Sequence, residues 1–437
     1  MRSIPKITSS HQLINQLQHN IQWGQRGNFL DVPTDCPQRD ERLGWTGDAQ
    51  AFARTATFNF DVHNFFTKWL NDLEADQING SVPFVVPNVL GKGAAGSAGW
   101  ADAATIIPWT MYLAYGDKRI LEDQYASMKA WVGYMERNST NYLWNKGFHF
   151  GDWLFYRPFD DNDGRAAVTD KYMIAQCFFA HSTDLLIKTA RVLGEQDDVT
   201  RYTQLLKNIK DAYLKEYMTP NGRLVSSTQT AYVLALNFDV LPENLRASAA
   251  ERLVENIRSY GNHLTTGFLG TPYLCHVLSR FGYTDVAYTL LLQETYPSWL
   301  YPVKMGATTI WERWDGIKPD STFQTPGMNS FNHYAHGAIG DWMYRVVTGI
   351  DTDESAPGYK FIVIKPHLDN RLTHASSEYQ TGYGLVKSAW ASGETKTTFD
   401  ITIPPNTKAT VYLPADSADK ITEGLKPLSS VREIQVA

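Results

Sequence analysis

The stretch DVHNFFTKWLNDLEAD, residues 61–76, decides the fold class. Its large apolar residues recur at spacings of three and four, which places them on one face of an α-helix. These residues are Phe65, Phe66, Trp69, Leu70 and Leu73. An apolar stripe of this width is typical of a helix that packs one side against a protein core.

The same pattern recurs along the chain up to about residue 350. In 9–23, Leu13, Leu17 and Ile21 share a helical face, with a serine available to cap the helix start. Further helices are predicted at 47–57, 101–116, 118–138, 169–193, 198–217, 227–239, 243–258, 269–281, 284–295 and 332–348. Helices in series without a fixed-period repeat predict six hairpins closed into a ring, an (α/α)6 barrel.

The pattern changes after Gly349. Short β-branched segments separated by turn residues follow: FIVIKP (361–366), GLVKSAWAS (384–392), KTTFDITIP (396–404) and KATVYLP (408–414). They predict a small antiparallel β-sandwich of ordinary domain size. We therefore expect a mainly α protein with a barrel domain at 1–350 and a β-sandwich domain at 351–437.

The composition of the chain limits the classes of binding partner that are expected. The net charge is −6 and no long basic run occurs, so neither nucleic acid nor an anionic membrane surface is an expected partner. No apolar run approaches the roughly 18 residues of a membrane span. The chain has 13 Trp, 23 Tyr and 20 Phe. Sugar-binding clefts favour such residues, because the apolar face of a pyranose stacks on a flat ring.

Cysteine usage and the N-terminus bear on the cellular compartment. The spacing of Cys36, Cys177 and Cys275 fits neither a disulfide framework nor a zinc site, so reduced thiols are expected. The opening MRSIPKITSSHQLINQL lacks the uninterrupted apolar region of a signal peptide. A cytoplasmic protein is the expectation.

Several of the predicted linkers are long: 24–46, 77–100, 139–168, 259–268 and 296–331. Loops of this length in a compact domain usually carry function. They hold many of the tryptophans and acids of the chain, so candidate site residues are sought in them.

The first loop contains DCPQRDERLGWTGD (35–48), where arginines and a tryptophan stand among the acids Asp35, Asp40, Glu41 and Asp48. If these acids converge, mutual repulsion and burial raise at least one pKa. A carboxylic acid kept protonated can protonate a glycosidic oxygen, and Trp45 can supply a flat wall for a sugar. The competing interpretation is a salt-bridged, helix-capping loop, and these residues alone do not choose between Asp40 and Glu41.

A possible partner lies in GATTIWERWDG (306–316), where Glu312 stands between Trp311 and Trp314. A glutamate between two tryptophans is unusual for a surface charge, although it could equally be a hydrogen-bonded acid that supports the loop. Closure of a helical ring would bring this loop and that of Glu41 to one mouth.

Other loops repeat the combination of aromatic and polar residues. SAGWADAA (97–104) offers Trp100 and Asp102, FGDWLFY (150–156) offers Asp152, Trp153 and Tyr156, and SFNHYAHG (330–337) offers His333 and His336. The two tryptophans could equally be core residues, and His336 is expected to be structural. Neither histidine has the company of metal ligands, so no metal and no cofactor is expected.

Together these motifs resemble a known family. DVPTDCPQRDERLGWTGDAQ (31–50), followed in order by GWADAA, TTIWERWDG and FNHYAHGAIGDW, is similar to the catalytic region of bacterial α-L-rhamnosidases of glycoside hydrolase family 78. The resemblance covers essentially the whole chain. It implies an (α/α)6 barrel followed by a β-sandwich, and an enzyme that removes terminal α-L-rhamnose with inversion from rhamnosylated small molecules or oligosaccharides.

Transferred residue by residue, the resemblance makes Glu41 the general acid and Glu312 the general base that activates water. It also implies sugar-binding positions, which are Asp35, Arg39, Trp45 and Asp48 in the first motif and Trp100, Trp153 and His333 elsewhere.

One feature departs from the family pattern. Members usually carry several β-sandwich domains before the barrel, sometimes including a calcium-dependent rhamnose-binding module, whereas Met1 lies just before the first predicted helix. The chain is therefore either a minimal form or a fragment, and the usual reason to expect calcium is absent.

Two alternatives compete with a glycoside hydrolase. An inverting phosphorylase on the same barrel needs a phosphate site in place of the base, and a carboxylate at Glu312 would repel phosphate. A non-catalytic sugar-binding protein would keep the tryptophans but needs neither Glu41 nor Glu312. The presence of both glutamates favours the hydrolase.

Overall fold

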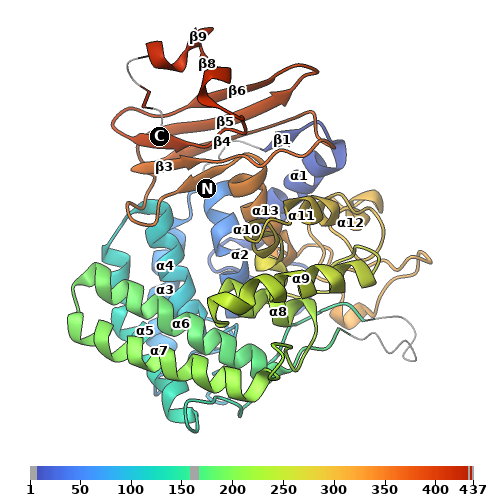
Figure 1. Ribbon diagram of the computed structural model, residues 1–437. Coiled ribbons are helices and arrows are strands. Elements are labelled where there is room, and N and C mark those ends of the chain that lie inside the picture. Colours follow the sequence, from blue (N-terminus) through green and yellow to red (C-terminus); the bar gives the residue numbers. More distant parts are fainter. Residues whose placement is uncertain (1–6, 158–166, 432–433, 436–437) are drawn as a thin grey trace.

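The computed structural model describes residues 7–157, 167–431 and 434–435. The helices form one body and the strands lie together against one end of it (Figure 1). Positions 158–166 of the predicted loop 139–168 lie outside the described residues.

Six helices form a closed inner ring. Each contacts the next one in the ring, and the last contacts the first. They are α2 (Thr46–Asn59), α4 (Ala103–Tyr115), α6 (Lys171–Leu193), α8 (Gln229–Asn237), α10 (Thr271–Arg280) and α13 (Ile339–Trp342). This ring confirms the (α/α)6 barrel predicted from the apolar stripes.

Sequence composition explains which helices lie inside. Helix α2 buries every residue except Arg54, and α8 buries every residue except Asn237. A helix that is apolar or small all round needs protein on every side. The inner helices have such neighbours because a second set of helices surrounds them.

The outer helices carry one apolar stripe each. They are α1 (Gln12–Asn28), α3 (His63–Asp76), α5 (Arg119–Asn138), α7 (Gln196–Tyr217), α9 (Glu243–Ser259) and α11 (Thr284–Leu291). In α3 the buried residues are Phe66, Trp69, Leu70 and Leu73, the stripe read from the sequence. All twelve predicted helical segments are helical in the structure.

Two details differ from the prediction. The segment predicted as a helix at 332–348 consists of 3₁₀ helix η2 (Ala335–Ala338), α13 and π-helical η3 (Met343–Val347). A short helix, α12 (Leu300–Lys304), and a 3₁₀ turn, η1 (Pro326–Met328), interrupt the loop predicted at 296–331. Each is too short to produce a recognisable apolar period.

The strands begin where the helices end. The last helical segment of the barrel ends at Val347, and Ile350 opens the first strand of the second region, β2. One sheet has the order β1 (Thr8–Ser9), β4 (His374–Thr381), β5 (Gly384–Ser392) and β6 (Thr397–Thr402), and all its pairs are antiparallel. Two residues near the N-terminus thus extend a sheet built from the C-terminal part of the chain.

A second sheet has the order β2 (Ile350–Thr352), β3 (Phe361–Ile364) and β7 (Lys408–Val411). Strands β3 and β7 pair in parallel, so this sheet is mixed, in contrast to the all-antiparallel sandwich expected. A small hairpin of β8 (Thr422–Glu423) and β9 (Lys426–Pro427) follows. Strand β4, HASSEYQT, was missed because its buried positions include Ser377 and Thr381, which do not read as an apolar alternation.

The two regions share one hydrophobic core, which runs from the helices to Tyr379 and Trp390. The Trp390 indole donates a hydrogen bond to the carbonyl of Val347 (2.8 Å), and the Ser388 hydroxyl donates to that of Thr348 (2.6 Å). The strands therefore satisfy the backbone at the end of the last barrel helix, as helix ends require.

The site loops share one end of the barrel. Five of them lead into the N-termini of inner helices: 29–45 precedes α2, 77–102 precedes α4, 139–170 precedes α6, 260–270 precedes α10, and 305–334 precedes η2 and α13. Because neighbouring inner helices are in contact, these loops meet around one mouth. The predicted site residues come from four of the five, except Asp48, which lies in the first turn of α2.

Two further sequence expectations concern helices and thiols. Within the described ranges, no helix has the length and apolar character needed to cross a membrane. Cys36, Cys177 and Cys275 are buried and unpaired, as expected for thiols without a disulfide framework.

Candidate active site

The loop before α2 turns sharply between Asp40 and Leu43. The backbone N–H of Asp35 donates to the Leu43 carbonyl (3.0 Å), and the Leu43 N–H donates to the Asp35 carboxylate (3.0 Å). Arg42 adopts a left-handed conformation at φ 56°, which is unusual for a residue with a side chain. The loop is thereby closed on itself.

This turn separates two neighbouring acids. The Asp40 side chain is fully exposed and contacts only Arg42, at 3.2 Å. The Glu41 side chain is 25% exposed and is held by the Trp45 indole N–H, which donates to Oε1 at 2.7 Å. The ambiguity between these acids in the sequence thus corresponds to two very different environments.

Arg39 joins Glu41 to Glu312. Its Nε and Nη2 atoms donate to Glu41 Oε2 at 2.8 and 2.5 Å. Its Nη1 and Nη2 atoms donate to the two oxygens of Glu312 at 2.6 and 3.2 Å. Two glutamates 271 positions apart in the sequence therefore share one guanidinium. Burial lowers the pKa of Arg39, but its contacts with Glu312 and Glu41 outweigh this effect and the net shift is upward.

Glu312 sits on a short two-stranded ribbon. Its N–H donates to the Ser330 carbonyl (2.9 Å), and the His333 N–H donates to the Ile310 carbonyl (2.8 Å). The Gln38 amide donates to the Ser330 hydroxyl (2.7 Å), which ties the ribbon to the loop of Glu41. The ribbon buries the Glu312 side chain, which is 4% exposed.

Asp35 and Asp48 are two further acids of the site, and both are buried. Burial raises the pKa of Asp35 to about 6, with smaller contributions from the charges of Asp48 and Glu41, while His333 acts in the opposite direction. Asp48, in the first turn of α2, lies 3.0 Å from His333 Nε2. Burial lowers the pKa of His333, but the nearby carboxylates of Asp48, Glu312 and Asp35 together outweigh this effect and the net shift is upward.

Asp35, Cys36 and Glu41 place potential metal ligands within 4.8 Å of one another. The chemistry of this trio does not suit a metal. The Cys36 thiol donates to Asp35 (3.0 Å), and burial raises the pKa of that thiol, whereas a metal needs a thiolate. The guanidinium of Arg39 already neutralises the carboxylates. The expectation of no metal at this position stays a prediction.

The three predicted tryptophans surround Phe150. Its ring centroid lies 5.7 Å from that of Trp45, 4.5 Å from that of Trp100 and 5.9 Å from that of Trp153. Trp100 packs on the first turn of α2, where a Cβ added to Gly47 would come within 2.5 Å of the indole. Phe150 stood inside a quoted motif but was overlooked, because a phenylalanine among tryptophans gives no separate signal.

The tryptophans differ in exposure. Trp45 and Trp153 are half-buried, so their rings have accessible faces. Trp100 is only 2% exposed, and its Nε1 atom has no hydrogen-bond partner among the described residues. Asp35, Asp48 and His333 are similarly buried, so little of their surface is accessible to a ligand in this conformation.

Two other acids of the tryptophan-rich loops serve the scaffold. Asp102 accepts hydrogen bonds from the Gly99 N–H (2.7 Å), the Trp131 indole (2.9 Å) and the Ser182 hydroxyl (2.5 Å). Asp152 accepts from the Thr230 hydroxyl and from three backbone N–H groups of the loop before α10, those of Gly267, Leu269 and Gly270. Burial raises the pKa of both acids.

His336 is structural, as expected from the sequence. It lies in η2 and stacks on Trp314 with a centroid distance of 3.9 Å. Burial lowers the pKa of His336 well below its usual value, so it is a neutral packing residue.

These observations first define a class. A closed six-hairpin barrel that gathers two linked glutamates, further acids and half-buried tryptophans at one mouth has the architecture of a carbohydrate-active enzyme with paired carboxylates.

Comparison with known proteins gives the family. Residues 2–347 match the bacterial α-L-rhamnosidase six-hairpin glycosidase domain, and residues 349–426 match the bacterial α-L-rhamnosidase C-terminal domain. The chain belongs to the bacterial α-L-rhamnosidase family, which confirms the resemblance seen in the sequence motifs.

Similarity to individual proteins agrees with this family assignment. The chain is 46% identical to an α-L-rhamnosidase of Formosa agariphila over 95% of its own length and 44% of the relative, and 45% identical to one of Streptomyces avermitilis over 94% and 38%. The crystal structure of a Streptomyces avermitilis α-L-rhamnosidase complexed with L-rhamnose superposes with a TM-score of 0.91 at 44% identity, covering 96% of this chain and 39% of that one. The chain thus spans less than half the length of these relatives.

Proposed function

We propose that this chain is the catalytic part of an α-L-rhamnosidase that hydrolyses terminal α-L-rhamnose with inversion. Its substrates are rhamnosylated small molecules or oligosaccharides. The observation that carries the proposal is the pair Glu41 and Glu312, which come from distant loops and meet at one guanidinium. Names of relatives over nearly the whole chain support the substrate.

The spacing of the pair supports inversion. Glu41 occupies the Nε–Nη2 edge of the Arg39 guanidinium and Glu312 the Nη1–Nη2 edge. One guanidinium group therefore stands between the two carboxylates and keeps them apart. Inverting enzymes need roughly 6.5–9.5 Å, which leaves room for a water molecule, and retaining enzymes need roughly 5–5.5 Å.

In the proposed reaction Glu41 protonates the glycosidic oxygen. Glu312 removes a proton from a water molecule that attacks the anomeric carbon from the opposite face of the ring. Glu41 accepts hydrogen bonds from Arg39 and Trp45 in the structure, so the substrate oxygen has to replace one of these contacts. Trp45 then keeps the remaining oxygen in place.

The residues around the two glutamates stabilise charge on the sugar and shape the pocket that holds it. Carbocation character develops at the anomeric carbon, and carboxylates at Asp35 and Asp48 stabilise positive charge nearby. The half-buried faces of Trp45 and Trp153 suit a deoxysugar whose methyl replaces a hydroxymethyl group. An apolar wall by itself discriminates only about 10²-fold against an added hydroxyl.

The configuration of the first product tests the proposal. We expect the chain to release β-L-rhamnose from p-nitrophenyl α-L-rhamnoside, followed by slow mutarotation, in a time course of proton NMR spectra. Initial appearance of α-L-rhamnose would show retention and overturn the mechanism. If no rhamnose is released by a folded sample, the proposed activity itself is wrong.

A further inference from the structure

The two loops that carry the proposed acid and base are anchored to each other where they join the barrel helices. The Tyr334 hydroxyl donates to the carbonyl of Pro33 at 3.0 Å, and this contact is buried. The amide of Asn28, the last residue of α1, donates to the Asn332 side chain at 3.1 Å. These contacts lie at the ends of the two loops, so the distance between the two carboxylates depends on further links closer to them.

Two side-chain links join these loops close to the glutamates, within the part of the chain that the structure describes. One is Arg39, which donates to both Glu41 and Glu312. The other is the Gln38 amide, which donates to the Ser330 hydroxyl at 2.7 Å. The two links come from adjacent residues of one loop, and the second contains neither of the two carboxylates.

Entry of the substrate changes the first link. The glycosidic oxygen has to replace a hydrogen bond that Arg39 or Trp45 donates to Glu41. When the arginine yields its place, it no longer holds the acid at a fixed distance from the base. A sugar bound between the two glutamates does not require the hydrogen bond of Gln38 to break, so this second link remains.

Ser330 connects the second link to the base. Its carbonyl accepts the backbone N–H of Glu312 at 2.9 Å, while its hydroxyl accepts from Gln38. Ser330 is fully buried, and its hydroxyl accepts a further hydrogen bond from the Asn332 N–H at 3.3 Å. A buried hydroxyl that loses a partner does not regain one from bulk water. The exposed Gln38 side chain thus satisfies a buried group that holds the base.

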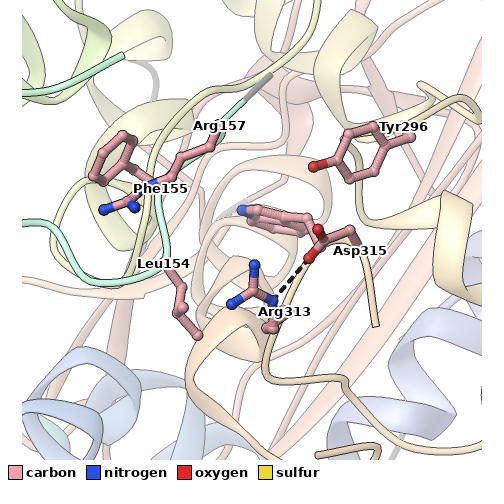
Figure 2. Close-up of a pocket in the computed structure, with 7 residues that line it drawn as sticks. Leu154, Phe155, Arg157, Tyr296, Arg313 and Asp315 are labelled. Carbon is pink, nitrogen blue, oxygen red and sulfur yellow. Dashed lines mark hydrogen bonds and ion pairs between the residues drawn. The ribbon is translucent and has the colours of Figure 1, made fainter. Parts of the chain in front are cut away.

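The chain that follows Glu312 is tied to the chain that leads to Ser330. Arg313 Nε donates to one oxygen of Asp315 at 2.9 Å, beside a small cavity (Figure 2). The Gln324 amide donates to the other oxygen at 2.6 Å. The loop is therefore braced on both sides of the base, and we expect a displacement of its Ser330 end to reach Glu312.

We propose that Gln38 and Ser330 are positioning residues, which keep the general acid and the general base at a working separation while a rhamnoside is bound. The inference rests on the proposed rhamnosidase activity and adds two residues that act through Glu41 and Glu312. Their effect is on the rate, because reacting groups misplaced by about 1 Å can lose about 10²-fold in rate.

Two single variants and their combination test the pair. Gln38→Met keeps the length of the side chain and removes its amide, and Ser330→Ala removes the hydroxyl. We expect each to lower kcat on an alkyl α-L-rhamnoside about tenfold with KM within about twofold, since the hydrogen bond acts on the reacting geometry. The double variant should lose no more than the single ones, because it removes the same hydrogen bond.

The leaving group distinguishes positioning of the pair from support of the acid alone. p-Nitrophenyl α-L-rhamnoside needs little protonation, but the attack of water on it still needs the base. We therefore expect losses of similar size on the alkyl and p-nitrophenyl substrates. A purely structural role would lower the unfolding midpoint in urea and leave kcat of the folded enzyme unchanged.

Gln204→Met is the matched control. Gln204 is an exposed glutamine of α7 that also donates an amide hydrogen bond, to Asn208 at 3.0 Å. Because α7 is an outer helix, the control should keep kcat within about twofold of the wild type.

All rates are compared at a temperature below the unfolding midpoint of each variant. Unchanged kcat in Gln38→Met, or losses that multiply in the double variant, would overturn the positioning pair and leave the proposed function standing. If Ser330→Ala does not fold, Gln38→Met decides, because its side chain is exposed. A folded wild type that hydrolyses no rhamnoside would instead overturn the proposed function.

Discussion

Two pairs of acids in this barrel look alike in sequence and differ in their hydrogen-bond partners. Asp102 and Asp152 stand beside tryptophans in the loops before α4 and α6, just as Glu41 and Glu312 stand beside tryptophans in theirs. Asp102 and Asp152 bond to neutral donors of the scaffold. Glu41 and Glu312 bond to a shared cation.

The difference in hydrogen-bond donors distinguishes acids that support the loops from acids proposed to act in the reaction. Neutral backbone and hydroxyl donors that surround a carboxylate leave no oxygen for a ligand and tie the loop to its neighbours. An arginine that bridges two carboxylates fixes their distance and joins the two loops that carry them. Burial beside an aromatic residue therefore does not distinguish the two pairs of acids, whereas the kind of donor does.

The largest effect on stability is expected at Asp152. Asp152→Asn places an amide N–H₂ group against donors of Thr230 and the loop 267–270, which should cost about 3–5 kcal/mol in the free energy of unfolding. Urea unfolding measures this cost. Thr230→Val, which removes one of the four donors, should cost less. If Asp152→Asn kept full stability but lost activity, its assignment to the scaffold would be wrong.

The raised pKa of Asp35 predicts a pH dependence of the free energy of unfolding. Its folded-state pKa is about 6 against an ordinary value of 3.8, so the folded state binds more protons between these values. The stability contribution is thus complete below about pH 4 and is lost as the pH rises through about 6, an effect on the order of 3 kcal/mol.

Asp35→Asn removes this titration. The free energy of unfolding of the wild type should fall relative to that of Asp35→Asn between pH 4 and pH 6, as measured by urea unfolding at several pH values. Parallel pH dependence of the two proteins in this window would contradict the burial argument. The window lies below the raised pKa of His333, whose titration affects stability only at higher pH.

A smaller effect is expected at Trp45. Trp45→Phe keeps an aromatic ring beside Phe150 but deletes the N–H that donates to Glu41. We expect kcat on an alkyl α-L-rhamnoside to fall about tenfold. The p-nitrophenyl substrate should lose less, because its leaving group needs little protonation. Equal losses on both substrates would argue against a role in positioning the acid.

The sequence predicted the helical framework well because apolar stripes report burial directly. Phe66, Trp69, Leu70 and Leu73 form the buried face of α3 as their spacing indicated. The sequence pattern could not predict the strand Thr8–Ser9, because that strand exists only by pairing with Ser376 and Ala375, far along the chain. The parallel pairing of β3 with β7 is likewise a long-range property.

The site was predictable in part. Motifs marked the loops that meet at the mouth, but spacing alone could not separate Asp40 from Glu41. The left-handed turn at Arg42 and the donors around each acid give the two side chains different environments. The bridge made by Arg39 was also invisible, since the resemblance placed this arginine among sugar-binding positions and its bonds in the structure go to Glu41 and Glu312.

The most direct test of the account compares adjacent acids on an alkyl α-L-rhamnoside. Glu41→Gln and Glu312→Gln should each lower kcat by about 10²–10⁴-fold, measured at a temperature below the unfolding midpoint of each variant. Asp40→Asn, which alters an exposed side chain, should stay within about twofold of the wild type. If Asp40→Asn were inactive and Glu41→Gln retained activity, the assignment of the acid and base would be contradicted.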